Sequence, residues 1–550
     1  MDLVTEVKRA VEFTKNNEFV KAERIYKTLL KDNKDNPLIL SFLGLLYLNM
    51  GLYKKAEKYL TLAYQLQHNF AVAEGLALTK YYLSKETESI KYFEEVIDKT
   101  KSFDVFDKYV NILLNNFKHT KALTYAKKCY ELFPLKKESI LNLVYSYMHV
   151  GEFKEAFSLC EQLVKQYPKY GEGWLKLGLI YEVYLHDEKV AKMCYQNVLK
   201  YGDKEAAYYN LAVNANKTGD YDKALEYLKK LKKTSNIEES FNFSMAVTYF
   251  KKRMFKKAYQ YYVKKEQDLF EKDSLVHQLK RLWDGKVYKD ETLLIFCDQG
   301  VGDCIMFARY IPYVANKFKR VKVLVRKSIV GLYKRSFKGL KNVEFYTKGK
   351  RFPHYDKSVV LSNLPYYLKM PLNNIPSSKG YMIADAEKIS EYQKRMQSNS
   401  FKVGICWEAG SAGWRELLNR TLNVSFYESF FNIKNIQFYS LQVNPSLDNY
   451  KKYSGLIDLG TSFKDFDDTA GAIKNLDLVI TVDTSVAHLA GALGVKTFML
   501  LPYCPDWRWF DNDNKTEWYD SIKIFKQKNT MSWDDVIDKI EKELYKRCIV

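Results

Sequence analysis

One periodicity constrains the first half of this chain more than any other feature of its sequence. A position suited to close helix packing recurs with successive spacings of 34, 34, 32, 34, 35, 33 and 34 residues. The residues at these positions are Ala22, Ala56, Ile90, Ala122, Ala156, Ala191, Ala224 and Ala258. Small side chains let two helices approach closely, and a two-helix hairpin cannot cover its apolar face alone. The pattern therefore predicts about eight stacked helical hairpins.

The residues between these positions agree with the same repeat. The matching residues are Leu40, Leu43, Gly44, Tyr47, Leu60 and Ala63 in one period, Trp174, Leu177, Gly178 and Tyr181 in another, glycines 51, 151 and 219 at the turns, and prolines 134 and 168 at repeat ends. This signature resembles the tetratricopeptide repeat over residues 1–268. The resemblance implies an α-solenoid whose concave groove binds a protein or peptide.

The second half of the chain has a different pattern, in which apolar runs alternate with helical stretches. Residues 269–290 are expected to link the two parts, with a helix near 274–283. Residues 291–385 and 400–550 then each show alternating strands and helices, which predicts two Rossmann-like domains with a site in the cleft between them. The fold class expected for the whole chain is thus an α-solenoid followed by a pair of α/β domains.

The segment from Leu476 to Phe510 is the most specific part of this second half. It predicts a buried strand over 476–481, a polar turn, a helix over 486–493, and a second buried strand over 495–501. Open α/β sheets bind ligands where such strands end, and a helix N-terminus favours a phosphate. The segment therefore indicates a nucleotide-dependent enzyme.

Charge is distributed unevenly along the chain, whose formal net charge is +21. Residues 311–380 contain 16 Lys and Arg against 2 Asp and Glu, whereas residues 401–550 contain 18 against 20. The basic block is compatible with a nucleic-acid surface, with an anionic acceptor, or with a solvated lysine-rich face. We favour the last of these and expect no nucleic-acid partner.

Other sequence features favour a reduced, aqueous compartment. The eight cysteines are scattered without metal-binding spacing, so no metal site is expected. The first residues do not resemble a signal peptide, and no apolar run is long enough for a membrane span. We expect a cytoplasmic protein.

Several motifs occur in a fixed order in the second half. These are "QGVGDCIMFARYIPYV", "VGICWEAG", "NRTLNVSFY", "FYSLQ" and "DLVITVDTSVAHLAGALGVKTFMLLPYCPDWRW". Together they resemble the tetratricopeptide-fused glycosyltransferases whose catalytic half is related to the ADP-heptose:lipopolysaccharide heptosyltransferases. The resemblance covers about residues 290–530. It implies a GT-B fold and inverting, metal-independent transfer of a sugar from a nucleotide-diphosphate donor, a co-substrate, with no further cofactor.

The resemblance also implies roles for individual residues. Asp303, after the turn formed by Gly300 and Gly302, matches the general base that deprotonates the acceptor hydroxyl. The residues that match the border of the donor diphosphate are Asp483, Thr484, Ser485 and His488. Arg420 is the expected cation beside the leaving diphosphate, and Gln442 is expected near the nucleoside.

Each of these roles has a structural alternative. Asp303 would serve equally as a helix N-cap, since Asp accepts first-turn N–H bonds. His488 would serve as a hydrogen-bonded structural residue, and Arg420 as a partner of surface carboxylates. Trp507 and Trp509 are expected to pack a loop rather than stack on a sugar. The stretch from Gly410 to Asn419 departs from the family pattern, so donor contacts there stay open.

The resulting hypothesis is a glycosyltransferase that modifies a hydroxyl of a protein acceptor presented by the repeats, such as flagellin or another surface protein. The alternative is a protein-interaction scaffold whose glycosyltransferase half has lost its activity.

Overall fold

The computed structural model describes residues 3–231, 238–272, 281–297, 300–347, 353–370, 372, 375–376, 379–410, 420–445, 448–510, 512, 514–528 and 532–548. The chain divides into two compact units, and the division lies within the repeat array. Unit 1 comprises Met1–Ile180 with Lys200–Gly202, and unit 2 comprises Tyr181–Leu199 with Asp203–Val550. The last helices of the array therefore belong to the same compact unit as both sheets.

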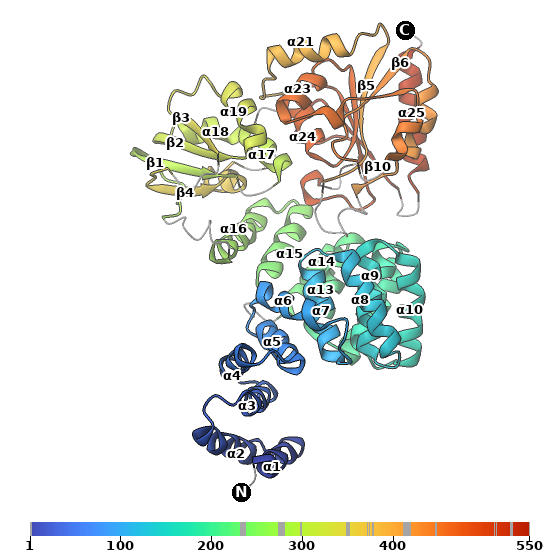
Figure 1. Ribbon diagram of the computed structural model, residues 1–550. Helices are drawn as coiled ribbons and strands as arrows, with labels where there is room; N and C mark the ends of the chain where they lie inside the picture. Colours follow the sequence, from blue (N-terminus) through green and yellow to red (C-terminus); the bar gives the residue numbers. More distant parts are fainter. Residues whose placement is uncertain are drawn as a thin grey trace. The chain divides into compact units, whose positions relative to one another are not determined.

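The array is built from helices α1 to α16 (Figure 1). Their bounds are α1 Leu3–Lys15, α2 Phe19–Asp32, α3 Pro37–Asn49, α4 Tyr53–Leu66, α5 Phe70–Tyr82, α6 Glu86–Val96, α7 Phe103–Asn115, α8 His119–Leu132, α9 Lys137–Val150, α10 Phe153–Gln166, α11 Gly171–Val183, α12 Glu188–Tyr201, α13 Lys204–Lys217, α14 Tyr221–Lys229, α15 Glu238–Lys251 and α16 Phe255–Lys272. The helical solenoid predicted from the repeat period is confirmed.

The small residues are buried between helices, as the period predicts, with one exception. The seven predicted alanines are all fully buried. In the third repeat, however, the small buried residue is Ser89, whose hydroxyl donates to the Ala77 carbonyl at 2.8 Å, whereas Ile90 is only partly buried. A β-carbon on Gly44 would lie 2.6 Å from the Leu60 side chain, so α3 and α4 approach too closely for any larger residue there.

The linking segment is only partly described. Helix α16 continues to Lys272, beyond the expected end of the array at 268, and the first strand begins at Tyr288. Most of the helix expected near 274–283 lies outside the described residues.

The first α/β half contains a four-stranded parallel sheet. Its elements are β1 Tyr288–Phe296, α17 Val301–Phe307, η2 Ala308–Tyr310, α18 Ile311–Ala315, β2 Phe318–Val325, η3 Lys327–Ile329, α19 Val330–Ser336, β3 Val343–Thr347, β4 Lys357–Val360, η4 Leu361–Asn363 and α20 Leu364–Tyr367. Helix α21, Ala386–Arg395, follows this half and packs on α23 of the next one. The strand order is β3-β2-β1-β4. We call residues 288–367 the four-stranded half.

The second α/β half contains a six-stranded parallel sheet in the order β10-β9-β8-β5-β6-β7. Its elements are β5 Phe401–Cys406, η5 Val424–Asn432, β6 Ile436–Ser440, η6 Asp448–Lys452, β7 Leu456–Asp458, η7 Gly460–Ser462, α23 Phe466–Ile473, β8 Leu478–Val482, α24 Ser485–Ala492, β9 Thr497–Leu501, η8 Trp507–Trp509, β10 Ile522–Lys526 and α25 Asp534–Cys548. We call residues 401–548 the six-stranded half.

The core of the six-stranded half explains why its strands are continuous apolar runs. Strands β8 and β9 are buried along their whole length. Figure 1 shows α24 and α25 on opposite faces of this sheet, so both faces are covered. On the α25 side, Val536, Ile540 and Leu544 pack into one cluster with residues of β5, β8 and β9. Among the described residues, no helix is long and apolar enough to cross a membrane.

Candidate active site

The order of the strands identifies the ligand-binding end of each sheet. In the six-stranded half, β5, β6 and β7 run outward in one direction and β8, β9 and β10 in the other, so the order reverses between β5 and β8. In the four-stranded half it reverses between β1 and β4. Ligands of open α/β sheets bind outside the carboxyl ends of the strands at such points. The turns after β1 and β8 contain the two motifs singled out from the sequence.

The first motif forms the N-terminal turn of α17. Gly300 is the N-cap residue, and Asp303 lies within the first turn rather than at the cap. A β-carbon on Gly302 would lie 2.8 Å from His488 Cδ2 and 3.6 Å from the Ser485 Cα. The glycine therefore permits the first turns of α17 and α24 to meet, which brings the two predicted motifs together.

The second motif forms the start of α24. Thr484 is the N-cap residue, and its hydroxyl accepts a hydrogen bond from the Val486 N–H at 3.2 Å. Ser485 is the first helical residue, one position earlier than the sequence indicated. The helix ends before Gly494, whose φ of +71° suits a glycine. The strands on either side are β8 and β9, each shorter at its start than the sequence indicated.

Asp483 and Arg420 lie together beside this turn. The Arg420 Nη1 is 3.8 Å from the Asp483 Oδ2. Burial raises the pKa of Asp483 to about 6; the charge of Asp506 acts in the same direction and that of Arg420 against it. The Arg420 side chain is about a quarter exposed, at 27%, so it is accessible to a ligand. Residues 411–419, where the family pattern is interrupted, lie outside the described residues.

His488 is held on the inner side of α24. Its Nδ1 lies 3.1 Å from the Tyr519 hydroxyl, and its ring stacks on Trp509 with centroids 5.1 Å apart. Burial lowers the pKa of His488 to about 3, and the charges of Arg508 and Arg309 act in the same direction. The imidazole is thus neutral near pH 7. These contacts fit the structural alternative for His488, and contact with a donor stays a prediction.

Gln442 connects the ends of β6 and β5. Its Oε1 accepts from the N–H groups of Trp407 and Glu408 at 3.2 and 2.9 Å and from the Cys406 thiol at 3.3 Å. Its Nε2 donates to the carbonyls of Glu408 and Val443. The side chain therefore fixes the loop after β5, and its predicted position near a nucleoside is not tested by these contacts.

Arg508 is a site residue that the sequence analysis missed. Its Nε donates to Asp303 Oδ1 at 2.7 Å, and its Nη1 donates to Asp506 Oδ1 at 2.7 Å. Burial opposes the charge, but Asp303 and Asp506 raise the pKa of Arg508 well above its ordinary value. The signal for it in the sequence is the alternation of Asp and Arg in "PDWRW".

The tryptophans of the same segment pack as expected. Trp507 and Trp509 are both buried. Trp507 stacks on Phe250 of α15 with ring centroids 4.1 Å apart and planes 16° apart. Their prediction as loop-packing residues is confirmed.

A second arginine joins the two α/β halves. Arg309, which is 1% exposed, donates to the carbonyls of Met306 and Trp518 at 2.9 and 2.7 Å. Its guanidinium also lies over the rings of Tyr381 and Tyr519. The bonds to Met306 and Trp518 link η2 to the segment before β10, so this side of the site has a fixed, buried connection.

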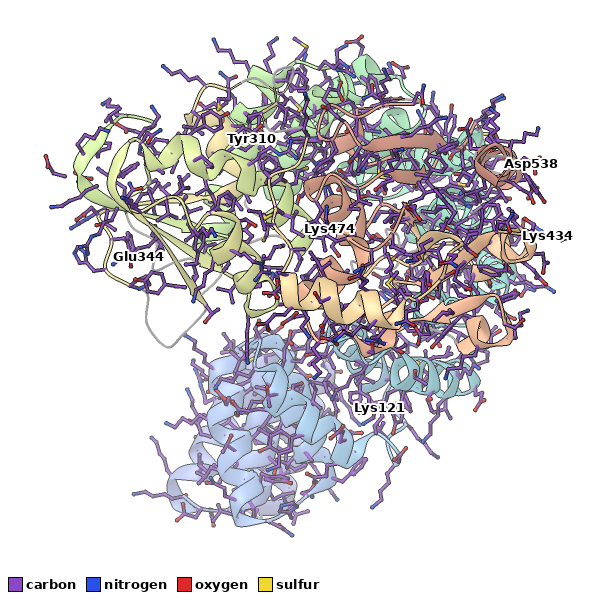
Figure 2. The ribbon with its side chains drawn as sticks, turned by 90° about the horizontal axis from the view of Figure 1, so that it is seen from above. Lys121, Tyr310, Glu344, Lys434, Lys474 and Asp538 are labelled. Carbon is purple, nitrogen blue, oxygen red and sulfur yellow. The ribbon has the colours of Figure 1, made fainter. Side chains whose placement is uncertain are left out.

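Part of the basic block lies away from this site. Lys319 and Arg320 begin β2, and Lys338 and Lys341 precede β3, so these four exposed side chains lie at the amino ends of the strands. Glu344 lies on the edge strand β3 (Figure 2) and is the one acidic residue between 311 and 350. The candidate site is at the opposite, carboxyl end, which argues against these cations as contacts of the reacting groups.

The candidate site therefore brings together Asp303 and Arg508, the pair Asp483 and Arg420, and the first turns of α17 and α24. Among the described residues, no three or more His, Cys, Asp or Glu side chains are arranged to hold a metal ion. The chemistry that this arrangement suits is recognition of an anion next to a carboxylate that can accept a proton.

Comparison with protein families identifies the first part of the chain. Two family models of the tetratricopeptide repeat match, one at residues 39–69 and the other at 138–170 and 206–234. The N-terminal region thus contains tetratricopeptide repeats, a class that commonly serves as a protein-interaction scaffold.

Curated relatives are distant. The chain is 25% identical to BBSome complex member BBS4 of Bos taurus over 221 residues, which is 40% of this chain and 42% of that protein. It is 21% identical to Protein FlbA of Caulobacter vibrioides over 285 residues, 47% of each. The match thus spans less than half the length of either relative.

Solved structures of tetratricopeptide repeat proteins are also similar to part of this chain. One is a tetratricopeptide repeat protein from Parabacteroides merdae, at 15% identity and a TM-score of 0.36, with 44% of this chain and 98% of that chain covered. Another is YrrB, described as a tetratricopeptide repeat protein with an unusual peptide-binding site, at 16% identity and a TM-score of 0.30, covering 37% and 97%.

Proposed function

We propose that this protein is an inverting, metal-independent glycosyltransferase that transfers a sugar from a nucleotide-diphosphate donor to a hydroxyl of a polypeptide acceptor. The observation that carries the proposal is the meeting of α17 and α24 at the switch points of both sheets, with Asp303 paired to Arg508. The motif resemblance supplies the reaction class, and the geometry supplies the groups that such a reaction needs.

In this proposal Asp303 takes the proton from the acceptor hydroxyl. The acceptor oxygen forms a bond to the anomeric carbon of the sugar while the bond from that carbon to the diphosphate oxygen breaks. The proton ends on Asp303 and the electron pair on the departing diphosphate. A carboxylate positioned in this way typically contributes about 10²- to 10⁴-fold to the rate.

The leaving diphosphate would be stabilised by charges from the six-stranded half. Arg508 and Arg420 supply guanidinium groups, and the N–H groups of Thr484 and Ser485 lie at the positive end of α24. Asp303 accepts a hydrogen bond from Arg508 Nε, so the proposed base would lie beside a cation of the leaving diphosphate.

The tetratricopeptide repeats support a polypeptide as the acceptor. Stacked repeats present extended surfaces to which peptides bind, and glycolipids have no comparable backbone to match. A surface protein such as flagellin, modified in the cytoplasm, fits this chemistry.

Nucleotide binding by the purified full chain tests the proposal. Calorimetric titration with UDP, GDP, ADP and CDP is expected to show binding of one nucleoside diphosphate, and the corresponding nucleotide sugars are expected to be hydrolysed slowly without acceptor. A chain that binds none of these and turns over no donor would instead be the scaffold with an inactive catalytic half. Intact-mass measurement of surface proteins from cells with and without this protein would then identify the acceptor.

A further inference from the structure

The last repeat hairpin, α15 and α16, contacts both α/β halves within unit 2. On the six-stranded side it meets residues 503–510, which we call the Arg508 loop. On the four-stranded side, Tyr259 of α16 lies 6.2 Å from Tyr366 between ring centroids, and Val263 lines a small cavity with Val359 and Val360 of β4. One hairpin therefore touches the halves that contain Asp303 and Arg508.

A line of side-chain contacts runs from this hairpin to the site. Phe250 stacks on Trp507 at 4.1 Å, and Tyr262 meets the same indole at 5.7 Å. The Arg508 guanidinium lies over the Trp507 ring at 4.7 Å and reaches Asp303. Because the Trp507 ring is in contact with both the repeat and the guanidinium, its orientation fixes that of Arg508.

The far end of the loop is held by the same hairpin. Phe510 adopts a left-handed backbone conformation with φ of +53°, which a bulky residue keeps only where its surroundings enforce it. Phe255 packs on its ring at 5.5 Å, and the Arg253 guanidinium lies 5.3 Å from the ring centroid.

Polar contacts reinforce the attachment. Arg253 donates to Glu517 and Asn512, each at 2.7 Å. The Lys251 ammonium donates to the Cys504 sulfur at 3.0 Å. Aromatic stacking and charged hydrogen bonds together thus hold both ends of the Arg508 loop against the terminal repeat.

We propose that α15 and α16 form a positioning element of the active centre, in which Phe250 acts through Trp507 to orient Arg508 toward Asp303 and the donor diphosphate. The hairpin is then part of the catalytic unit rather than a further acceptor-binding repeat. This inference rests on the proposed glycosyltransferase function for its kinetic consequences, but the attachment of the loop can be tested without it.

Phe250→Leu in the full chain is the central test. It removes the stacked ring and keeps an apolar side chain, so the repeat is expected to stay folded. We expect the amides of the Arg508 loop to exchange hydrogen about tenfold faster. Donor hydrolysis is expected to show a fall in kcat of about tenfold or more with a smaller change in KM for the donor. Phe250→Tyr keeps the ring and is expected to restore both.

Tyr249→Ala provides the matched control. Tyr249 is the neighbouring residue on α15 and stacks on Tyr261 of the same hairpin, 5.7 Å away. This variant perturbs the repeat without touching the Phe250–Trp507 stack, and loop exchange and kcat are expected to stay within about twofold of the parent. Arg253→Ala, which releases Glu517 and Asn512, is expected to accelerate loop exchange as Phe250→Leu does.

The outcomes separate this inference from the proposed function. Loop exchange and kcat in Phe250→Leu that equal those of Tyr249→Ala would overturn the positioning role. If the parent protein neither binds nucleoside diphosphates nor turns over a donor, the proposed function fails and loop exchange alone decides whether the hairpin holds the loop.

Discussion

The two α/β halves differ most in charge, and the candidate site takes its cations from the half that has no excess of them. Residues 311–380 carry 16 basic against 2 acidic residues, whereas residues 401–550 carry 18 against 20. Yet Arg420 and Arg508 both come from the six-stranded half, and the four-stranded half contributes the carboxylate of Asp303. Net charge over a region therefore did not indicate where the charged groups of the site would lie.

Sheet topology accounts for part of this difference. A parallel sheet sends one end of all its strands toward the ligand and the other end away from it. In the four-stranded half, Lys319, Arg320 and Lys341 lie at the amino ends of strands. Arg326 and Lys327 are the exception, since they follow the carboxyl end of β2. In the six-stranded half, Arg420 and Arg508 lie in segments that follow the carboxyl ends of buried strands. The position of a charged residue along its strand thus indicates whether it lies near the site better than the net charge of the region does.

Asp303→Asn is expected to have the largest effect, because it removes the carboxylate that the four-stranded half contributes to the proposed chemistry. Sugar transfer should fall about 10³-fold while nucleoside-diphosphate affinity changes little, since Asn keeps the size of the side chain but cannot accept the proton. Initial rates with a labelled donor and calorimetric titration would measure the two effects. Undiminished transfer would show that Asp303 is not the base.

Arg508→Ala tests the contribution of the six-stranded half and is expected to lower kcat/KM about 10²-fold. Arg508→Lys keeps the charge but not the forked geometry that serves two carboxylates, so it should recover only part of the loss. Arg420→Ala should weaken nucleoside-diphosphate binding by a smaller factor because Arg420 is partly solvated. Equal kinetics for Arg508→Ala and the parent would return the role of main cation to Arg420.

The buried histidine of the six-stranded half predicts a pH effect on stability. Burial lowers the pKa of His488 to about 3, whereas an unfolded histidine titrates near 6.5. Its contribution is therefore complete above about pH 6.5 and decreases as the pH falls toward 3, by about 2 kcal/mol between pH 6.5 and 5. The free energy of unfolding, measured with urea, should fall more steeply with decreasing pH in the parent than in His488→Gln over this range. Parallel pH profiles would show that His488 is accessible to protons in the folded chain.

Asp483 predicts a smaller effect of opposite sign. Because burial raises its pKa to about 6, the folded chain gains stability from this group as the pH falls from about 6 to its unfolded value near 4. The gain is about 1 kcal/mol between pH 6 and 5, and Asp483→Asn should lack it. Asp506→Asn is the informative contrast, since burial opposes the charge of Asp506 but Arg508 lowers the pKa of that carboxyl. If Asp506→Asn, rather than Asp483→Asn, lost this gain in stability, the raised pKa would belong to Asp506.

Features with a local cause were predictable from sequence. The repeat period predicted the solenoid, because each hairpin places a small residue at the same helix contact, and the buried strands β8 and β9 followed from continuous apolar runs. The error at Ile90 arose because a serine can replace alanine when its hydroxyl bonds within the helix pair, as Ser89 does with Ala77. A period alone does not distinguish these neighbours.

Features that depend on tertiary contact were not predictable in the same way. Asp303 and Arg508 are 205 residues apart and meet only because both sheets have folded. Whether a motif side chain is available to a ligand is also a tertiary property. His488 lies in the DTSVAH motif and Gln442 follows a strand. Neither position in the sequence reveals that Tyr519 contacts His488 Nδ1 or that Gln442 Oε1 binds the loop after β5.

Charge reversal at the amino end of the four-stranded sheet gives the smallest expected effect and the most direct test of the comparison. Lys338→Glu and Lys341→Glu alter two exposed residues at the end of the strands opposite the candidate site. A strand of five residues, such as β3, spans about 16 Å, and charges are largely screened beyond about 8 Å at physiological salt. The double variant should therefore bind nucleoside diphosphate within about twofold of the parent at 0.15 M salt, whereas Arg420→Ala binds more weakly. A tenfold loss in the double variant would show that the basic block acts on the site through its field, and that total charge, rather than position along the strand, governs recognition of the donor.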